Sequence, residues 1–134
     1  MSVIFKDYSK IVIDNINKEA GAWLEEVSAL VESQTKKNTK VKTGKTKGSW
    51  EHIVHEDEHY AEVGSRYINA LYEELGTGIY ALNGNGRKTK WVYTPDGKHY
   101  YTTVGKKPRR ALWNAYTNLK SRIIRTAQQR FKKL

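Results

Sequence analysis

The chain has 134 residues, which is enough for one compact core and too few for two comfortable domains, so we expect a single domain over residues 1–134. It contains no cysteine, which excludes disulfides and cysteine–metal sites, and no apolar run approaches the roughly 20 residues that span a bilayer, so we expect no membrane contact. Its 24 Lys and Arg against 14 Asp and Glu give a net charge of +10, which favours polyanions or acidic partners.

The composition leans towards a protein that assembles with partners. The apolar share of 38% is low for a globular domain, whereas aromatic residues make up 11%. A low apolar share indicates a thin core, a polar extension, or surface that is buried only in an assembly. Tyr and Trp are enriched at interfaces, although filling a small core explains these aromatic residues equally well.

The charge is spread unevenly along the chain. Residues 1–32 hold six acids and three bases, whereas residues 97–134 hold eleven Lys or Arg and no acid. Such a field favours DNA through counterion release, or an acidic face of a protein partner, and the sequence leaves both readings open.

Residues 9–35 predict one long amphipathic helix, because their apolar residues recur at steps of three and four. The stripe consists of Ile13, Ile16, Ala20, Trp23, Leu24, Val27, Leu30 and Val31. A helix of this length is long for so small a domain. We therefore expect part of it to pack on a sheet and part to reach a neighbouring subunit.

Residues 36–48 predict a long, mobile basic loop or arm, because they hold six lysines, no acid and one apolar residue, Val41. In the functional interpretation this arm orders on contact with DNA or a protein partner. In the alternative it is a solvated loop. The lysines assigned to such contact are Lys36, Lys37, Lys40, Lys42, Lys45 and Lys47.

Two β-hairpins are predicted, which together give a small antiparallel sheet of about four strands. Residues 49–54 and 60–64 alternate in polarity, with Trp50, His52 and Val54 on one side, and a polar turn joins them. Residues 90–94 and 99–104 are rich in aromatic and β-branched side chains and are joined by the turn sequence PDGK.

Between the hairpins, residues 69–78 predict a short helical corner that ends at Gly76. A helix this short is marginal alone, so it must dock on larger elements. The residues expected to shape this corner are Tyr72, Glu73, Gly76 and Thr77. Glu73 is expected to cap a helix or to bridge a neighbouring basic group.

A second apolar stripe predicts a C-terminal helix that begins near Pro108. Lys106, Lys107, Arg109 and Arg110 surround its start, where backbone N–H groups favour a DNA phosphate or an acidic partner. The expected fold is α+β, with the N-terminal and C-terminal helices packed against one face of the sheet.

No catalytic site is predicted. His52, His55 and His59 lie among three acids at 56–58, but residues three apart on a strand point to opposite faces and do not converge. No nucleophile elbow or phosphate-binding loop is present in the sequence. We therefore expect no enzyme, no metal and no cofactor; a metal-dependent nuclease built on the histidine turn is the weakest of three functional hypotheses.

Three segments resemble, in the same order, blocks of a family of tailed-phage minor tail components related to lambda-like gene-ten products. Residues 41–49 (VKTGKTKGS) are similar to V-x-T-G-x-L-x-x-S, and residues 68–77 (INALYEELGT) to Y-A-x-Y-V-E-F-G-T. Residues 105–115 (GKKPRRALWNA) are similar to G-x-x-P-x-x-F-L-x-x-A. The chain departs from these blocks at Thr46, in place of leucine, and at Ala111, in place of an aromatic residue.

The resemblance implies a structural virion protein at the head–tail junction of a tailed bacteriophage or prophage, made in the cytoplasm of the bacterial host. It implies a six-fold or twelve-fold homo-oligomeric ring that completes the tail, contacts other connector and tail-tube proteins, and surrounds the DNA channel. The alternative is a stand-alone protein that binds nucleic acid without sequence specificity, to which the charge of +10 points without the resemblance.

Overall fold

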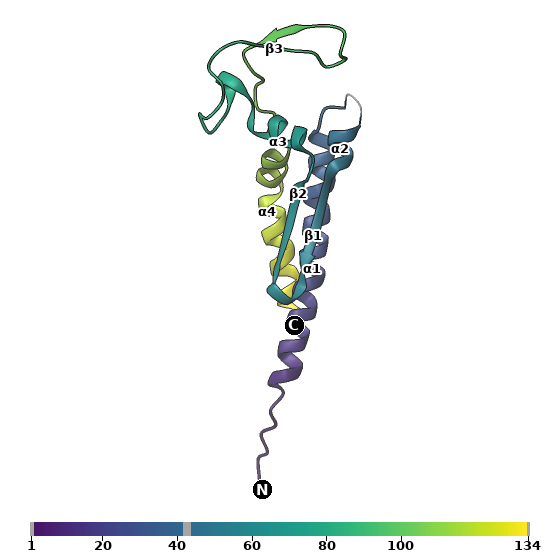
Figure 1. The fold of residues 1–134 in the computed structure, drawn as a ribbon. Coiled ribbons are helices and arrows are strands. Elements are labelled where there is room, and N and C mark those ends of the chain that lie inside the picture. The colour runs from purple at the N-terminus through teal and green to yellow at the C-terminus, as the bar shows by residue number, and fades with distance from the viewer. Residues whose placement is uncertain (1, 42–43, 134) are drawn as a thin grey trace.

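The computed structural model describes residues 2–41 and 44–133, and it has the α+β architecture that the sequence predicts (Figure 1). In chain order the elements are α1 (Ser9–Asn38), α2 (Lys45–Ser49), β1 (Trp50–His55), the 3-10 turn η1 (Glu56–Glu58), β2 (Tyr60–Ser65), α3 (Ile68–Leu75), the 3-10 turn η2 (Gly78–Tyr80), β3 (Trp91–Tyr93), β4 (Tyr101–Thr103) and α4 (Ala111–Lys132). None of the helices within these two ranges is long and apolar enough to cross a membrane.

Helix α1 is the central element of the molecule, and the β1–β2 hairpin and α4 pack along it (Figure 1). Its 30 residues span about 45 Å at 1.5 Å per residue. The predicted apolar stripe is buried only in its second half, where Val27 and Val31 are each 7% exposed. Ile13 and Ile16 are 55% and 42% exposed, so the first turns of α1 extend beyond the packed body.

Small polar residues let β1 and α4 approach α1 closely. Ser28 and Thr35 are almost fully buried, and their hydroxyls donate hydrogen bonds to the carbonyls of Leu24 (2.6 Å) and Val31 (2.7 Å), which satisfies both groups within the helix. The buried Trp50 at the start of β1 donates from its indole Nε1 to the hydroxyl of Thr39 at 2.9 Å. The hairpin is thereby fastened to the C-terminal end of α1.

Helix α4 packs mainly on α1 rather than on a sheet, which corrects the expected layering. Near its C-terminus Arg130 donates to Glu19 (2.7 Å) and Glu26 (2.6 Å) of α1. At its other end Asn38 Nδ2 donates to the carbonyl of Ala111 at 3.1 Å. These contacts tie the two helices together along the full length of α4.

The strands form two separate two-stranded sheets, so the expectation of one four-stranded sheet is wrong. In the first, Trp50 lies opposite Ser65, and in the second, Trp91 lies opposite Thr103. The short strands β3 and β4 carry no face that packs on α1, since Val92 is 60% exposed and Tyr101 is also exposed. Without a shared apolar face, the second hairpin has no reason to join the first sheet, and it lies at the far end of the molecule (Figure 1).

The basic loop expected over 36–48 is shorter than the sequence indicated. Lys36 belongs to the last turn of α1 and lies 4.0 Å from Glu32, and Lys45 and Lys47 belong to α2. Helix α1 continues to Asn38, past the predicted end at residue 35, because the hydrogen bonds of Asn38 and Thr39 described above stabilise a helical turn that the local sequence does not favour. Lys42 lies outside the described residues, and the mobility of the segment stays a prediction.

Candidate interaction site

The predicted corner is present, and in it residues 76–79 are bonded to residues 104–106, which are distant in sequence; we call this contact the clasp. Helix α3 ends at Gly76, whose φ of 77° lies in the left-handed region, as the sequence predicted. Immediately afterwards, the Thr77 N–H donates to the carbonyl of Lys106 (2.9 Å) and the Lys106 N–H donates to the hydroxyl of Thr77 (2.9 Å). The Ile79 N–H adds a third bond across the corner, to the carbonyl of Val104 (3.0 Å).

Glycine is required on both sides of this clasp. A Cβ atom on Gly78, which has a φ of +60°, would lie 1.9 Å from the carbonyl oxygen of Val104. A Cβ atom on Gly105 would lie 2.1 Å from the carbonyl oxygen of Thr77. The two backbones therefore approach to a distance that no side chain permits.

Glu73 bridges the basic residues that precede α4, in keeping with the bridging role expected for it. Its carbonyl accepts the Arg109 N–H at 2.7 Å, and its carboxylate pairs with Lys106 and lies 3.6 Å from Arg109 Nε. Tyr72 lines a hollow beside the corner. Two residues that the sequence assigned to DNA or partner contact are thus ion-paired within the chain.

The other two basic residues of this segment rest on aromatic rings. Lys107 Nζ lies 5.8 Å from the ring centre of Tyr80, and the Arg110 guanidinium lies 4.9 Å from that of Trp113. Both positions suit cation–π attraction, so these side chains also help to hold the corner. Their contact with an external partner stays a prediction.

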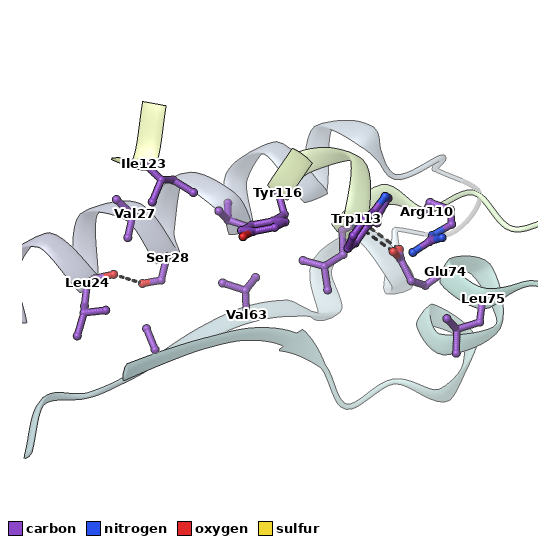
Figure 2. A pocket seen from close by; sticks show the side chains of 13 residues that line it. Leu24, Val27, Ser28, Val63, Glu74, Leu75, Arg110, Trp113, Tyr116 and Ile123 are labelled. Carbon is purple, nitrogen blue, oxygen red and sulfur yellow. Dashed lines mark hydrogen bonds between the residues drawn. The ribbon is translucent and has the colours of Figure 1, made fainter. Parts of the chain in front are cut away.

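Glu74 caps the N-terminus of α4 from across the corner (Figure 2). Its carboxylate oxygens accept the N–H groups of Leu112 (3.0 Å) and Trp113 (2.9 Å). Helix α4 begins at Ala111, three residues later than expected, because the Arg109 N–H bonds to Glu73 and Arg110 adopts a φ of 57°. Two of the N–H groups that the start of α4 offered to an external anion are therefore already occupied by Glu74.

A mainly apolar groove of about 450 Å³ opens between β2 and α4, with α1 as its floor, and we call it the β2–α4 groove (Figure 2). Trp113, which is 51% exposed, and Tyr116 line it from α4. Its remaining lining residues are Leu24, Val27, Ser28 and Val31 of α1, Ala61 and Val63 of β2, Glu74 and Leu75 of α3, and Arg110, Leu112 and Ile123. A groove of this chemistry suits an apolar segment of a protein rather than a charged ligand.

The outer face of α4 carries basic residues that form no ion pair within the described part of the chain. They are Lys120, Arg122, Arg125 and Lys132, together with Lys133, which follows the last residue of α4, and all five are exposed. Lys37, Lys40 and Lys47, from the predicted basic arm, are exposed as well. These groups are available to a polyanion or to an acidic partner.

His52 joins β1 to α1. Its Nε2 lies 2.7 Å from Glu25 and its Nδ1 lies 3.4 Å from Glu32, so its two nitrogens face two different carboxylates. His55 contacts Glu62 at 3.3 Å and stacks on Tyr60. Across residues 2–41 and 44–133, no group of three His, Cys, Asp or Glu side chains is arranged to hold a metal ion.

The contact of His52 is expected to weaken as pH rises. The hydrogen bond to Glu25 is the main cause that raises the pKa of His52 above its ordinary value of 6.5. A histidine whose pKa is higher in the folded than in the unfolded state adds to the free energy of unfolding. This contribution is complete below the unfolded-state pKa and is lost as pH rises through the folded-state pKa. His52→Gln should therefore cost about 0.5–1 kcal/mol more at about pH 5.5 than at about pH 8.5.

Urea unfolding at the two pH values measures this difference. The control is His59→Asn, which alters an exposed histidine in the η1–β2 turn whose left-handed φ of 58° asparagine also tolerates. Equal losses for His52→Gln at both pH values would show that the imidazolium charge contributes nothing to this contact.

Comparison of the chain with protein-family models, with curated proteins and with solved structures finds no match. The residues missed by sequence reasoning are Glu74, Gly78 and Gly105, together with the β2–α4 groove. The sequence carried a partial signal for the glycines, since GTG and VGKKP stand where turns were expected. It carried none for Glu74, whose bonded partners lie 38 and 39 residues away.

Proposed function

We propose that this chain is a structural virion protein at the head–tail junction of a tailed bacteriophage or prophage, where its copies form a ring that completes the tail around the DNA channel. Its partners are other copies of itself, head–tail connector proteins and tail-tube proteins. The observation that carries the proposal is an excess of exposed surface. The chain exposes 10182 Å², whereas a compact monomer of this mass exposes about 7,200 Å².

That excess, about 3,000 Å², fits a subunit that is completed by neighbours, since a standard interface takes roughly 800 Å² from each partner. The core supports the same interpretation because it is thin. Its buried apolar residues are Val27, Val31, Trp50, Ala70, Ala111 and Ala115, and three of these are alanines. Much of the apolar surface of the chain is thus left for partners to cover.

The three segments that resemble phage tail components also lie together. The third segment bonds to the second through Thr77, Glu73 and Glu74. The first segment includes α2, which packs against α3, and its Ser49 accepts a hydrogen bond from Ser65 at 2.7 Å. Segments that form one structural unit are more informative than three scattered matches, and this supports the family proposal.

The mechanism we propose is mechanical rather than chemical. In the corner, Glu74 caps α4 and Glu73 pairs with Lys106 and Arg109. We propose that these contacts make the corner a rigid joint between the long α1–α4 body and the β3–β4 hairpin. Such a joint suits a ring subunit that must hold two docking faces at a fixed angle. Exposed lysines of the basic segment, such as Lys37, Lys40 and Lys47, would then face DNA in the channel or lock neighbouring subunits.

Deletion of the gene in a host that carries the phage tests this role. We expect filled heads and finished tails to accumulate separately, and a plasmid copy of the gene to restore joined particles. Antibody labelling of the restored particles should mark the head–tail junction. Infectious, joined particles made without the chain would contradict the proposal.

A stand-alone protein that binds nucleic acid without sequence specificity is the second candidate, and the unpaired bases on the outer face of α4 favour it. Neutralising Arg122 and Arg125 should then weaken duplex binding and reduce the salt dependence of the affinity by about two phosphate contacts. In the head–tail proposal the same variant should still assemble, because assembly rests on apolar surface.

A further inference from the structure

The N-terminal arm, which we define as residues 2–16, extends beyond the packed body (Figure 1). It consists of residues 2–8, which form no helix or strand, followed by the first turns of α1. The segment at residues 3–5 (VIF) is exposed throughout, and Phe5 is 92% exposed. The other large exposed apolar residues of the arm are Tyr8, Ile11, Val12, Ile13 and Ile16. So much contiguous apolar surface marks a contact site.

The β2–α4 groove has an apolar lining and a free strand edge, which can cover the exposed apolar residues of the arm. It is lined mainly by apolar side chains, and β2 borders it with a strand edge that pairs with no strand among the described residues. A free edge beside an apolar groove accepts an extended segment, because its N–H and C=O groups bond to the incoming backbone while the groove receives alternate side chains. Residues 3–5 form no helix or strand of their own, and they are apolar and rich in strand-forming types, so they can extend along such an edge.

The arm cannot fill the groove of its own chain. The α1 wall of the groove begins at Leu24, fifteen residues after Ser9 and therefore about 22 Å along the helix axis. Phe5 is four residues before Ser9, so a chain that folds back along α1 carries it at most about 14 Å from Ser9 towards Leu24. Val3 reaches about 21 Å, which is still short of Leu24 and leaves no residue to reverse the direction of the chain. The groove that receives the arm must belong to another copy.

We propose that residues 3–5 of one copy bind along the free edge of β2 in the β2–α4 groove of the next copy. Val3 and Phe5 lie on one side of an extended chain, so they enter the groove together, while Ile4 faces away. Each subunit gives one arm and receives one, which makes the contact head-to-tail and suits closure into a ring. The contact draws on the excess of exposed surface described above.

This inference goes beyond the proposed function, because it requires no other phage component. Light scattering behind size exclusion tests it with the variant Val3→Asp/Phe5→Asp. The matched control is Ser2→Asp/Asn15→Asp, which adds the same two charges to the same arm at exposed polar positions. We expect the unmodified chain and the control to form the same oligomer, and the test variant to elute with the monomer mass of 15.5 kDa.

Circular dichroism of the test variant should be unchanged, since the substituted side chains are 76% and 92% exposed. A test variant that assembles like the unmodified chain overturns the inference, and so does an unmodified chain that is monomeric at about 200 μM, a concentration at which a contact of micromolar affinity is nearly saturated. A monomer would leave the head–tail proposal to be decided by gene deletion, so the two failures are distinguishable.

Disulfide trapping locates the contact, because the chain has no cysteine of its own. Chains with Phe5→Cys and chains with Ala61→Cys, on β2, are mixed under mild oxidation with tags of different mass. We expect a cross-linked heterodimer in this mixture. Val92→Cys, on exposed β3, replaces Ala61→Cys as the control and should give no such product. Trapping at Val92 in preference to Ala61 overturns the inference.

Discussion

Gly78→Ala is expected to destabilise the protein by about 3 kcal/mol or more, and to lower its melting temperature by about 10 °C. The added methyl group would lie 1.9 Å from the carbonyl oxygen of Val104, in a residue whose φ is already +60°. Neither backbone can move without breaking the Ile79–Val104 hydrogen bond, so the two segments of the corner must separate. Urea and thermal unfolding measure the effect.

Gly84→Ala is the matched control for this prediction. Gly84 also has a positive φ, of +69°, but a Cβ atom there would meet nothing within 4 Å. The control therefore carries only the conformational cost of the left-handed region, about 1 kcal/mol. If both variants lose the same stability, the close approach of the two segments does not exist in solution.

Glu74→Ala is expected to cost about 2 kcal/mol, because it removes the cap of α4 and a negative charge from the N-terminus of the helix. The N–H groups of Leu112 and Trp113 lose their acceptor, and the link between α3 and α4 is lost with them. Glu74→Gln retains one carbonyl acceptor and should lose about half as much. Hydrogen exchange of the two N–H groups gives a residue-level measurement, and both should exchange faster in the alanine variant.

Glu58→Ala is the control for the change in net charge, since Glu58 is an exposed acid of η1 whose side chain forms no hydrogen bond with another described residue. It should leave both the unfolding free energy and the exchange at Leu112 unchanged. Unaltered protection of Leu112 and Trp113 in Glu74→Ala would contradict the capping role.

The elements that sequence reasoning predicted well are those whose signals are local. The period of the apolar stripe located α1 to its first residue, and alternation located β1 and β2 to within one residue. Gly76 ended α3 because a left-handed position is a property of one residue and its immediate neighbours.

The features that were missed or misplaced depend on contacts between distant residues. The late start of α4 follows from Arg109 and Glu74, whose partners lie more than thirty residues away in sequence. The separation of the two sheets depends on where α3 and the corner carry the chain, which no strand pattern records. All four basic residues at 106, 107, 109 and 110 contact Glu73 or an aromatic ring, and a charge pattern cannot distinguish such residues from free ones.

Helix α1 shows a further limit of sequence patterns. Its apolar stripe runs without interruption from Ile13 to Val31, yet the chain covers only the second half of it. Periodicity shows which face of a helix avoids water, but it is silent on whether that face is covered by the same chain or by another one. For a protein that assembles, the sequence therefore predicts the helix more reliably than its packing.

The central claim is that this chain is a subunit whose exposed apolar surface is buried by other copies. Light scattering behind size exclusion, at low and high salt and with and without duplex DNA, tests it most directly. We predict one oligomer of fixed mass without DNA at both salt concentrations, because apolar contacts are not weakened by salt. A monomer or dimer that gains mass only with DNA, and only at low salt, would contradict the claim and favour the nucleic-acid-binding alternative.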